Sequence, residues 1–282
     1  MMSEPAATTG LWLYAVARGL GSASLDDLRG VAGAEVRAVA VAGEGAGEGT
    51  GEGALTAVVS PVPLTEFGED ALRRNLEDLD WLAATARAHD TVVAAVSGVA
   101  SAAVPLRLAT VCFDEERVRT LVEESRHAFT ATLDALTGRT EWGVKVYTDP
   151  VKLAESAEPA EPAPSSSGGS GGSGAAYLRR RKAALSARET GERVAAEHAE
   201  RLHARLASAA VAHRRHPPQD PKLSGERDHM VLNGAYLVDD DRASGFAELV
   251  RALDAEHEAV RVELTGPWPP YSFAAVGQAE QS

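Results

Sequence analysis

The chain has 282 residues and carries 41 acidic against 28 basic side chains, a formal net charge of −13 at neutral pH. This charge argues against binding to nucleic acids and anionic membranes, because both attract basic proteins. Cys112 is the only cysteine, so no internal disulfide can form and we expect a reducing cytosol. Without a secretory signal or an apolar run of about 18 residues, the sequence predicts a cytoplasmic protein with no membrane segment.

The first 150 residues mix strands and helices without a regular repeat. Five runs rich in strand formers predict strands at 11–17, 35–42, 55–60, 104–111 and 141–147. The first of these runs is apolar throughout, so we expect it to be buried on both faces. Residues 43–53 alternate Gly with Glu, Ala and Thr and predict an acidic hairpin loop whose carboxylates would repel phosphate. Together these features predict an α+β domain with a largely antiparallel sheet.

Three helices are expected in the same region from apolar residues at helical spacing. A stripe predicts one helix at about 70–86 through Leu72, Leu76, Leu79 and Ala83. A second helix is expected over 89–98. A third stripe runs from Val118 to Leu136, with Asp114 placed to cap its start and Gly138 placed to end it. We therefore expect one long helix between those two residues.

The candidate catalytic and metal-binding residues do not form a site. His89 has no partner for acid–base work and is expected to cap a helix or border the core. Arg107 lies between apolar neighbours, so an inward side chain needs a carboxylate partner; a structural ion pair is expected, with an anion site as the alternative. Cys112 has no activating neighbour and is expected to be a buried, inert thiol. His213 and His216 are separated by two arginines that oppose a cation. We predict no enzyme, no cofactor and no metal.

The second part of the chain follows a Pro/Ser/Gly-rich segment at 151–174, which predicts a flexible linker. Residues 175–216 contain no proline and are rich in Ala, Arg, Glu and Leu, so they predict one long helix with a thin apolar stripe. Its basic cluster, 179–182, is expected to dock carboxylates. A strand at 230–238, a helix around 246–257 and a strand at 260–264 complete a smaller α+β domain at 175–282.

The end of this domain is dense in prolines and aromatic residues. The segment 264–273 reads Leu-Thr-Gly-Pro-Trp-Pro-Pro-Tyr-Ser-Phe. Proline fixes φ and removes a backbone donor, so the segment is neither helix interior nor central strand, and it is stiff before folding. Its rings are large enough to anchor either a core or a partner, and the residues alone leave both possibilities open.

This segment resembles the C-terminal signature of the GvpL/GvpF family of gas vesicle proteins. The residues 138–145, Gly-Arg-Thr-Glu-Trp-Gly-Val-Lys, are similar to the internal signature of the family. The segment from Pro105 to Thr110 resembles Pro-Leu-Arg-Phe-Gly-Thr, with Leu108 and Ala109 in place of Phe and Gly. The resemblance covers most of the chain, apart from the Gly/Glu loop, the Ser/Gly linker and the tail.

The resemblance implies a GvpF-like minor structural or assembly protein of the gas vesicle, the organelle of buoyancy. It implies binding to the hydrophobic shell protein GvpA and to other gas vesicle proteins, with a role in vesicle nucleation. It also implies a ferredoxin-like variant for the domain at 1–150. A small-molecule-binding regulatory module of ferredoxin-like fold is the alternative, and a hydrolase using His89 is a third possibility. The signature residues are expected to be structural or partner-binding: Arg107, Glu141, Trp142, Gly143, Gly266, Pro267, Trp268, Pro269, Pro270, Tyr271 and Phe273.

Overall fold

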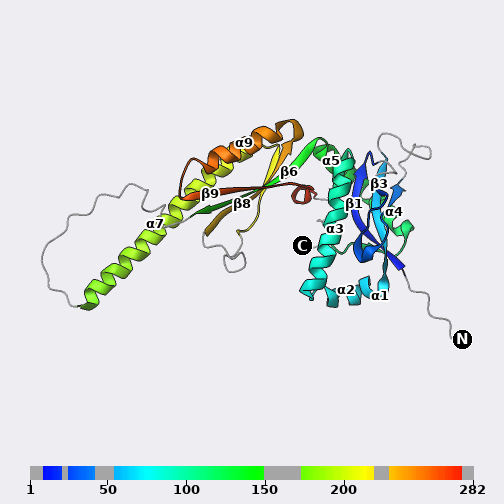
Figure 1. The fold of residues 1–282 in the computed structure, drawn as a ribbon, viewed down its shortest axis with the longest axis horizontal. Coiled ribbons are helices and arrows are strands. Elements are labelled where there is room, and N and C mark those ends of the chain that lie inside the picture. Colours follow the sequence, from blue (N-terminus) through cyan, green and yellow to red (C-terminus); the bar gives the residue numbers. More distant parts are fainter. Residues whose placement is uncertain (1–8, 21–24, 42–53, 149–172, 219–228, 275–282) are drawn as a thin grey trace. The chain divides into compact units, whose positions relative to one another are not determined.

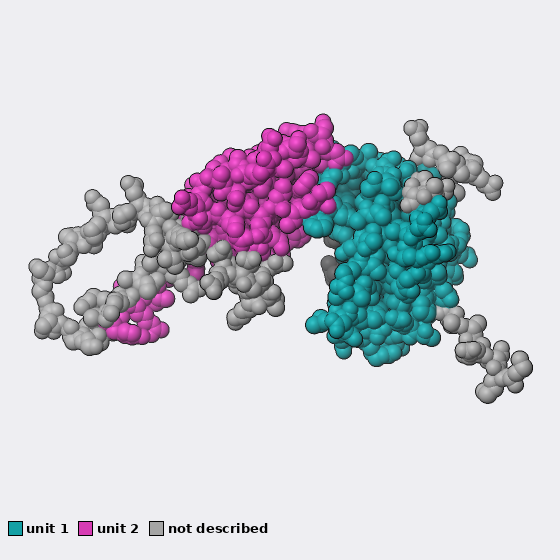
Figure 2. Space-filling model, in the orientation of Figure 1, with its two compact units in different colours: residues 1–141, 268–282 teal, residues 142–267 magenta. Residues whose placement is uncertain are grey.

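The structure is a computed structural model that describes residues 9–20, 25–41, 54–148, 173–218 and 229–274 (Figure 1). The chain divides into two compact units (Figure 2). Unit 1 comprises Met1–Glu141 with Trp268–Ser282, and unit 2 comprises Trp142–Pro267. The predicted Gly/Glu loop and almost all of the predicted linker lie outside the described residues. The units differ from the domains expected at 1–150 and 175–282, because strand β6 (Arg139–Thr148) belongs mainly to the second sheet and the chain end to unit 1.

Unit 1 is built on an antiparallel sheet with β1 (Thr9–Arg18) at its centre. Its strands follow the order β2-β3-β1-β4, and the short β5 also pairs with β1. The other bounds are β2 (Arg37–Val41), β3 (Leu55–Pro63), β4 (Ala102–Pro105) and β5 (Val111–Cys112). The pairings of β1 with β3, β4 and β5 and of β2 with β3 are all antiparallel, as predicted. Residues 11–17 are all buried, which confirms a strand covered on both faces.

Helices cover the two faces of this sheet. Helix α3 (Leu79–Val99) packs its Val92, Val93 and Val96 into one core cluster with Trp12 and Tyr14 of β1. Helices α4 (Glu115–Glu124) and α5 (Arg126–Leu136) contact β1 to β4, and Figure 1 shows α3 and α4 on opposite sides of the strands. The short helices α1 (Leu64–Phe67) and α2 (Glu69–Asn75) connect β3 to α3. Unit 1 therefore has the mixed helix-and-sheet character that was expected.

The helix predicted at 70–86 is wrong, because the chain breaks between α2 and α3. The carboxylate of Asp78 accepts hydrogen bonds from the backbone N–H groups of Asp80 (3.0 Å) and Trp81 (3.2 Å). This cap starts a new helix, which then continues without interruption through the second predicted helix at 89–98. Leu76 and Leu79, expected on the buried stripe, lie at the break, and Leu79 is 78 % exposed.

Two other elements are also divided. The long helix predicted after Asp114 is two helices, since Ser125 adopts a non-helical conformation between α4 and α5. Asp114 does cap α4, accepting from the Arg117 backbone N–H at 2.8 Å, and Gly138 has a φ of +67° after α5, as expected of a helix-ending glycine. The strand predicted at 104–111 is interrupted after Pro105 by a turn in which Ala109 has a φ of +69°.

Unit 2 contains the second sheet, in the order β7-β8-β6-β9. Its remaining elements are α7 (Ser173–Ser208), β7 (Ala212–Arg215), β8 (His229–Asp239), α9 (Ala243–Asp254) and β9 (Val260–Trp268). One core cluster joins α7, α9 and the sheet through Leu206, Tyr236, Phe246, Val250 and Leu253. Short 3-10 turns occur in both units: Asp240–Arg242 lies in unit 2, whereas Val31–Gly33 and Tyr271–Phe273 lie in unit 1.

The helix predicted at 175–216 ends earlier, at Ser208. Residues 212–215 instead form β7, which pairs antiparallel with β8, and the backbone N–H of His216 donates to the Asn233 carbonyl at 2.8 Å. Ladder hydrogen bonds thus outweigh the helix propensity of this segment. Among the described helices, none combines the length and the apolar character that crossing a bilayer requires.

Candidate functional site

The buried carboxylate of Glu141 holds the C-terminal segment of unit 1. Glu141 is 7 % exposed, and both of its oxygens accept hydrogen bonds from Ser272. The Ser272 backbone N–H donates to Oε2 at 2.9 Å and the Ser272 hydroxyl donates to Oε1 at 2.6 Å. A carboxylate that accepts two such bonds fixes its donors more firmly than a neutral acceptor does. Glu141 therefore locks the turn Tyr271–Phe273, which is a positioning role.

Tyr271 makes the second attachment of this segment. Its hydroxyl donates to Asp90 Oδ1 of α3 at 2.9 Å, and its ring lies 6.5 Å from the imidazole of His89 between centroids. Burial, followed by the bond to Asp90, raises the pKa of the Tyr271 hydroxyl well above its usual range. Pro270 is buried beside it. The segment 268–273 is thus fastened to unit 1 at Glu141 and at Asp90.

Trp268 is not buried by these attachments. The residue is 53 % exposed, whereas Pro269 and Phe273 are half-buried. The sequence left open whether the aromatic rings of this segment serve a core or a partner. The structure distinguishes them by attachment and by degree of exposure: the Tyr271 hydroxyl is bonded to Asp90 of α3 and the residue is 37 % exposed, whereas Trp268 is 53 % exposed.

The signature residues of unit 2 meet across neighbouring strands. The Thr265 hydroxyl of β9 donates to the Gly143 carbonyl of β6 at 3.3 Å, and a Cβ at Gly143 would lie 2.4 Å from that hydroxyl oxygen. Trp142 packs against the core cluster of unit 2, and its buried Nε1–H has no acceptor among the described residues. Gly266 has a φ of +114°, which favours glycine, and the Gly266–Pro267 peptide bond is cis.

His89 is a core residue rather than a helix cap. It is 1 % exposed, its Nδ1 accepts from the Trp12 indole N–H at 2.9 Å, and its Nε2 lies 3.2 Å from the Leu106 carbonyl. These partners fix a neutral ring with the proton on Nε2, because Nδ1 must accept. Burial lowers the pKa of this imidazole, and the nearby Asp90 carboxylate only partly opposes that effect.

Arg107 does not point into the core. It is exposed in the turn after β4, its carbonyl accepts from the Thr110 hydroxyl at 2.8 Å, and it forms no ion pair with a described residue. The structural ion pair expected for an inward Arg107 is therefore not formed. Cys112 is buried, and burial raises the pKa of its thiol, which fits the expected inert residue.

Sequence reasoning did not identify the partners that hold the site. Ser272 lies within the C-terminal signature and Asp90 in a predicted helix, but neither was singled out, and their roles appear only through contacts that span 131 and 181 residues. Tyr14 was also missed: its hydroxyl bonds Ser60 Oγ at 2.6 Å and accepts from the Val31 backbone N–H at 2.7 Å. Pairs so distant in sequence leave no local pattern.

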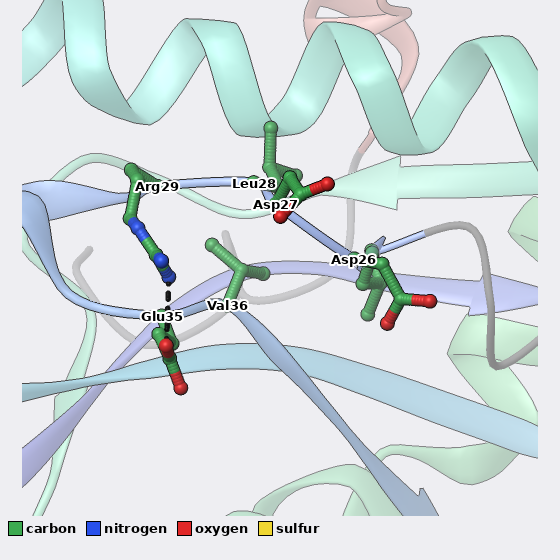
Figure 3. A pocket seen from close by; sticks show the side chains of 7 residues that line it. Asp26, Asp27, Leu28, Arg29, Glu35 and Val36 are labelled. Carbon is green, nitrogen blue, oxygen red and sulfur yellow. Dashed lines mark ion pairs between the residues drawn. The ribbon is translucent and has the colours of Figure 1, made fainter.

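One described pocket, of about 310 Å³, is lined by none of these residues (Figure 3). Its walls are the segment from Leu25 to Arg29 together with Glu35 and Val36. Figure 3 shows the Arg29 guanidinium facing Glu35, and the two form an exposed ion pair at 3.1 Å. No group of three or more His, Cys, Asp or Glu side chains suited to a metal ion occurs among the described residues.

Comparisons of the fold and of the sequence with known proteins both find gas vesicle proteins. Two crystal structures, of gas vesicle protein GvpF from Anabaena sp. PCC7120 and from Microcystis aeruginosa, share the fold. The TM-scores are 0.64 and 0.61, the identities are 19 % and 16 %, and each comparison covers 94 % of this chain. They cover 96 % and 98 % of the two GvpF chains.

Sequence relatives are also gas vesicle proteins. Gas vesicle protein L of Streptomyces sp. strain CB03234 is 45 % identical over 226 residues, which is 80 % of this chain and 82 % of that protein. Gas vesicle protein F of the same strain is 28 % identical over 223 residues, 78 % of this chain and 84 % of that one. The family described as "Gas vesicle synthesis protein GvpL/GvpF" matches residues 10–275. The match includes both signature segments, and the chain belongs to the GvpL/GvpF family of gas vesicle proteins.

Proposed function

We propose that this protein is a cytoplasmic assembly factor that binds the hydrophobic shell protein GvpA at the growing gas vesicle. Family membership supports a gas vesicle role, and the GvpL/GvpF description refers to vesicle synthesis. Small apolar shell subunits aggregate when they are exposed to water. A partner with a net charge of −13 keeps such subunits dispersed until they join a nucleus, because like charge opposes association of the complexes. Other gas vesicle proteins are further partners in this proposal.

The exposure of Trp268, 53 % for the whole residue, is the observation that carries the proposal. Asp90 and Glu141 hold Tyr271 and Ser272, three and four residues after Trp268, so the ring is presented next to a segment that is fastened to unit 1. Presenting a fixed side chain reduces the entropy that binding must overcome. Tryptophan is also enriched among the residues that dominate interface energies. An apolar shell subunit is the kind of partner that gains from covering this ring.

Co-expression with GvpA tests the proposal. We expect the tagged protein to retain GvpA in a pull-down and to raise the amount of soluble GvpA. Trp268→Ala should lower retention at least tenfold, the equivalent of about 1.4 kcal/mol, while the variant remains folded by thermal unfolding at the temperature of the pull-down. Phe113→Ala is the matched control, since Phe113 is another exposed aromatic of unit 1, 76 % exposed. Absence of GvpA retention by the unmodified protein would refute the proposed partner, and equal losses for both variants would refute the assigned contact.

The alternatives gain no support from the described residues. A small-molecule regulator was expected to bind near Arg107, but the described pocket is lined by other residues, and four of its seven lining residues are charged. Ligand pockets are mostly apolar with a few placed polar groups. A hydrolase based on His89 needs an accessible imidazole, whereas both ring nitrogens of His89 are occupied and buried. These observations favour a binding role without catalysis.

A further inference from the structure

Helix α7 has two halves with different surroundings. The helix has 36 residues, a length of about 54 Å. From Val194 onward its apolar side chains pack on the sheet of unit 2, with Ala195, Ala199, Leu202 and Leu206 buried. Before residue 191 the described side chains are all exposed, among them Tyr177 at 59 % and Leu185 at 54 %. Figure 1 shows this first half continuing past the strands of its own unit.

The exposed half of α7 has a charge opposite to that of the whole chain. Between residues 173 and 190 there are five cationic residues and one carboxylate, within a protein of net charge −13. Arg181 and Lys182 are exposed, and neither forms an ion pair with another described residue. The second half differs, since Arg193, Arg205 and Glu200 each pair with an opposite charge at 2.5–2.7 Å.

Like charges are concentrated in this half of the helix. Residues 179–182 are four consecutive cations, and the first and last of them, three residues apart, repel each other in a helix. The first turn of α7 contains no acidic side chain, and the one carboxylate between residues 173 and 190 is Glu189. A local arrangement that disfavours its own element is expected where function requires it. A partner that supplies negative charge removes this repulsion.

The exposed stripe of α7 also has an apolar component. Tyr177, Arg181 and Leu185 follow each other at intervals of four residues, so they lie along one face. Lys182 borders this stripe. An aromatic ring, a guanidinium and a leucine in a row suit another helix that carries apolar residues at the same spacing with carboxylates beside them.

We propose that the first half of α7, through Tyr177, Arg181, Lys182 and Leu185, docks an acidic amphipathic helix of a partner protein. A second copy of α7 is a poor occupant, because side-by-side pairing of two such halves brings their basic clusters together. An anionic lipid surface is also a poor occupant, because lipid-binding helices need a broader apolar face than two large side chains provide. This site goes beyond the contact assigned to Trp268, and it lies in the other unit.

A designed peptide pair tests the docking site on the full chain. The probe is a 21-residue helix with Leu at the a and d heptad positions and Glu at the flanking positions, and its control has Lys in place of Glu. We expect the acidic peptide to bind, the basic peptide to bind at least tenfold more weakly, and added salt to weaken the acidic complex. Binding is followed by fluorescence anisotropy of the labelled peptide. Hydrogen exchange is expected to slow for backbone amides within 177–190 in the complex.

Variants separate this site from general attraction between charges. The double variant Arg181→Glu, Lys182→Glu should bind the acidic peptide at least tenfold more weakly than the unmodified protein. The variant Leu185→Ala should bind it about threefold more weakly. Arg201→Glu, an exposed cation in the second half of the same helix, is the matched control and should change binding less than twofold. Equal losses for both charge reversals, or no binding by the acidic peptide, would overturn the proposal. Binding to phosphatidylglycerol vesicles without binding to the peptide would also overturn it and would identify a lipid surface instead.

Discussion

At the scale of single residues, the buried imidazole of His89 makes the stability of unit 1 depend on pH. His89 is neutral in the fold because Nδ1 accepts from Trp12, and burial lowers its pKa from the ordinary value of 6.5. The unfolded chain therefore binds this proton first as the pH falls. The contribution of neutral His89 to the free energy of unfolding is fully present above about pH 6.5. Below that pH it is lost, at up to about 1.4 kcal/mol per pH unit.

Replacing His89 by a side chain that does not titrate isolates this contribution. His89→Gln should lower the unfolding free energy at pH 7.5, since the packing and hydrogen bonds around the ring are disturbed. The difference from the unmodified protein should shrink as the pH falls toward 5, because the variant no longer takes up this proton on unfolding. Urea unfolding of both proteins at a series of pH values measures this difference in unfolding free energy. Parallel stability curves for the two proteins would contradict a buried neutral His89.

Ala109 shows that the sequence departs from its family at a conformationally demanding position. Its φ of +69° lies in the left-handed region, where a Cβ costs roughly 1–2 kcal/mol. The resembling family motif has glycine at this place. Ala109→Gly should therefore stabilise unit 1 by about 0.5–1 kcal/mol, after the greater flexibility of the unfolded glycine is subtracted.

Thermal unfolding measures the effect of Ala109→Gly. Ala131→Gly is the control, because Ala131 is exposed within α5, where glycine should cost about 1 kcal/mol. Loss of stability in both variants would mean that Ala109 is not strained. The sequence marked position 109 as a departure from the family, but only the structure gives it a backbone conformation.

At the scale of elements, Gly143 of β6 leaves room for the Thr265 side chain of the neighbouring strand β9. A Cβ at this position would lie 2.4 Å from the Thr265 hydroxyl oxygen, well inside van der Waals contact. Gly143→Ala should therefore destabilise unit 2 by about 1–3 kcal/mol through overpacking and the loss of the bond to the Gly143 carbonyl. Faster hydrogen exchange of the β6 and β9 backbone amides would report this loss of stability locally.

A second substitution tests the cause of the Gly143→Ala effect. Adding Thr265→Ala should restore most of the loss, because the clashing hydroxyl is removed, and the two changes should couple strongly. Gly245→Ala is the control: nothing lies within 4 Å of the added methyl group, and α9 should gain up to about 1 kcal/mol. Additive losses from Gly143→Ala and Thr265→Ala would disprove the steric explanation.

The elements also show what the sequence can and cannot predict. Strand β1, the Asp114 cap and the Gly138 terminator follow from local pattern, and all three are present. The break at Asp78 was missed because Leu72, Leu76, Leu79 and Ala83 keep helical spacing across it. Strand β7 was missed because its sequence favours helix, and only pairing with β8 decides otherwise. The partners of Glu141 and Tyr271 depend on distant contacts that no local pattern contains.

At the scale of the whole molecule, the two units are supported by different sets of buried side chains. Leu133 of α5 and Leu206 of α7 are both fully buried, the first in unit 1 and the second in the core cluster of unit 2. Removing three carbon atoms from either site leaves a cavity and should cost about 2–5 kcal/mol. Because the sites are otherwise alike, they form a matched pair for asking whether the units respond independently.

We expect each Leu→Ala substitution to loosen only its own unit. Leu206→Ala should speed hydrogen exchange in β8 and α9 while β1 and β3 keep their protection, and Leu133→Ala should do the reverse. Since the chain passes between the units twice, at Glu141–Trp142 and at Pro267–Trp268, coupling through β6 and β9 is the competing outcome. Loss of protection in both units from either substitution would mean that they unfold together. Their response decides whether partner binding at Trp268 and at α7 can be altered separately.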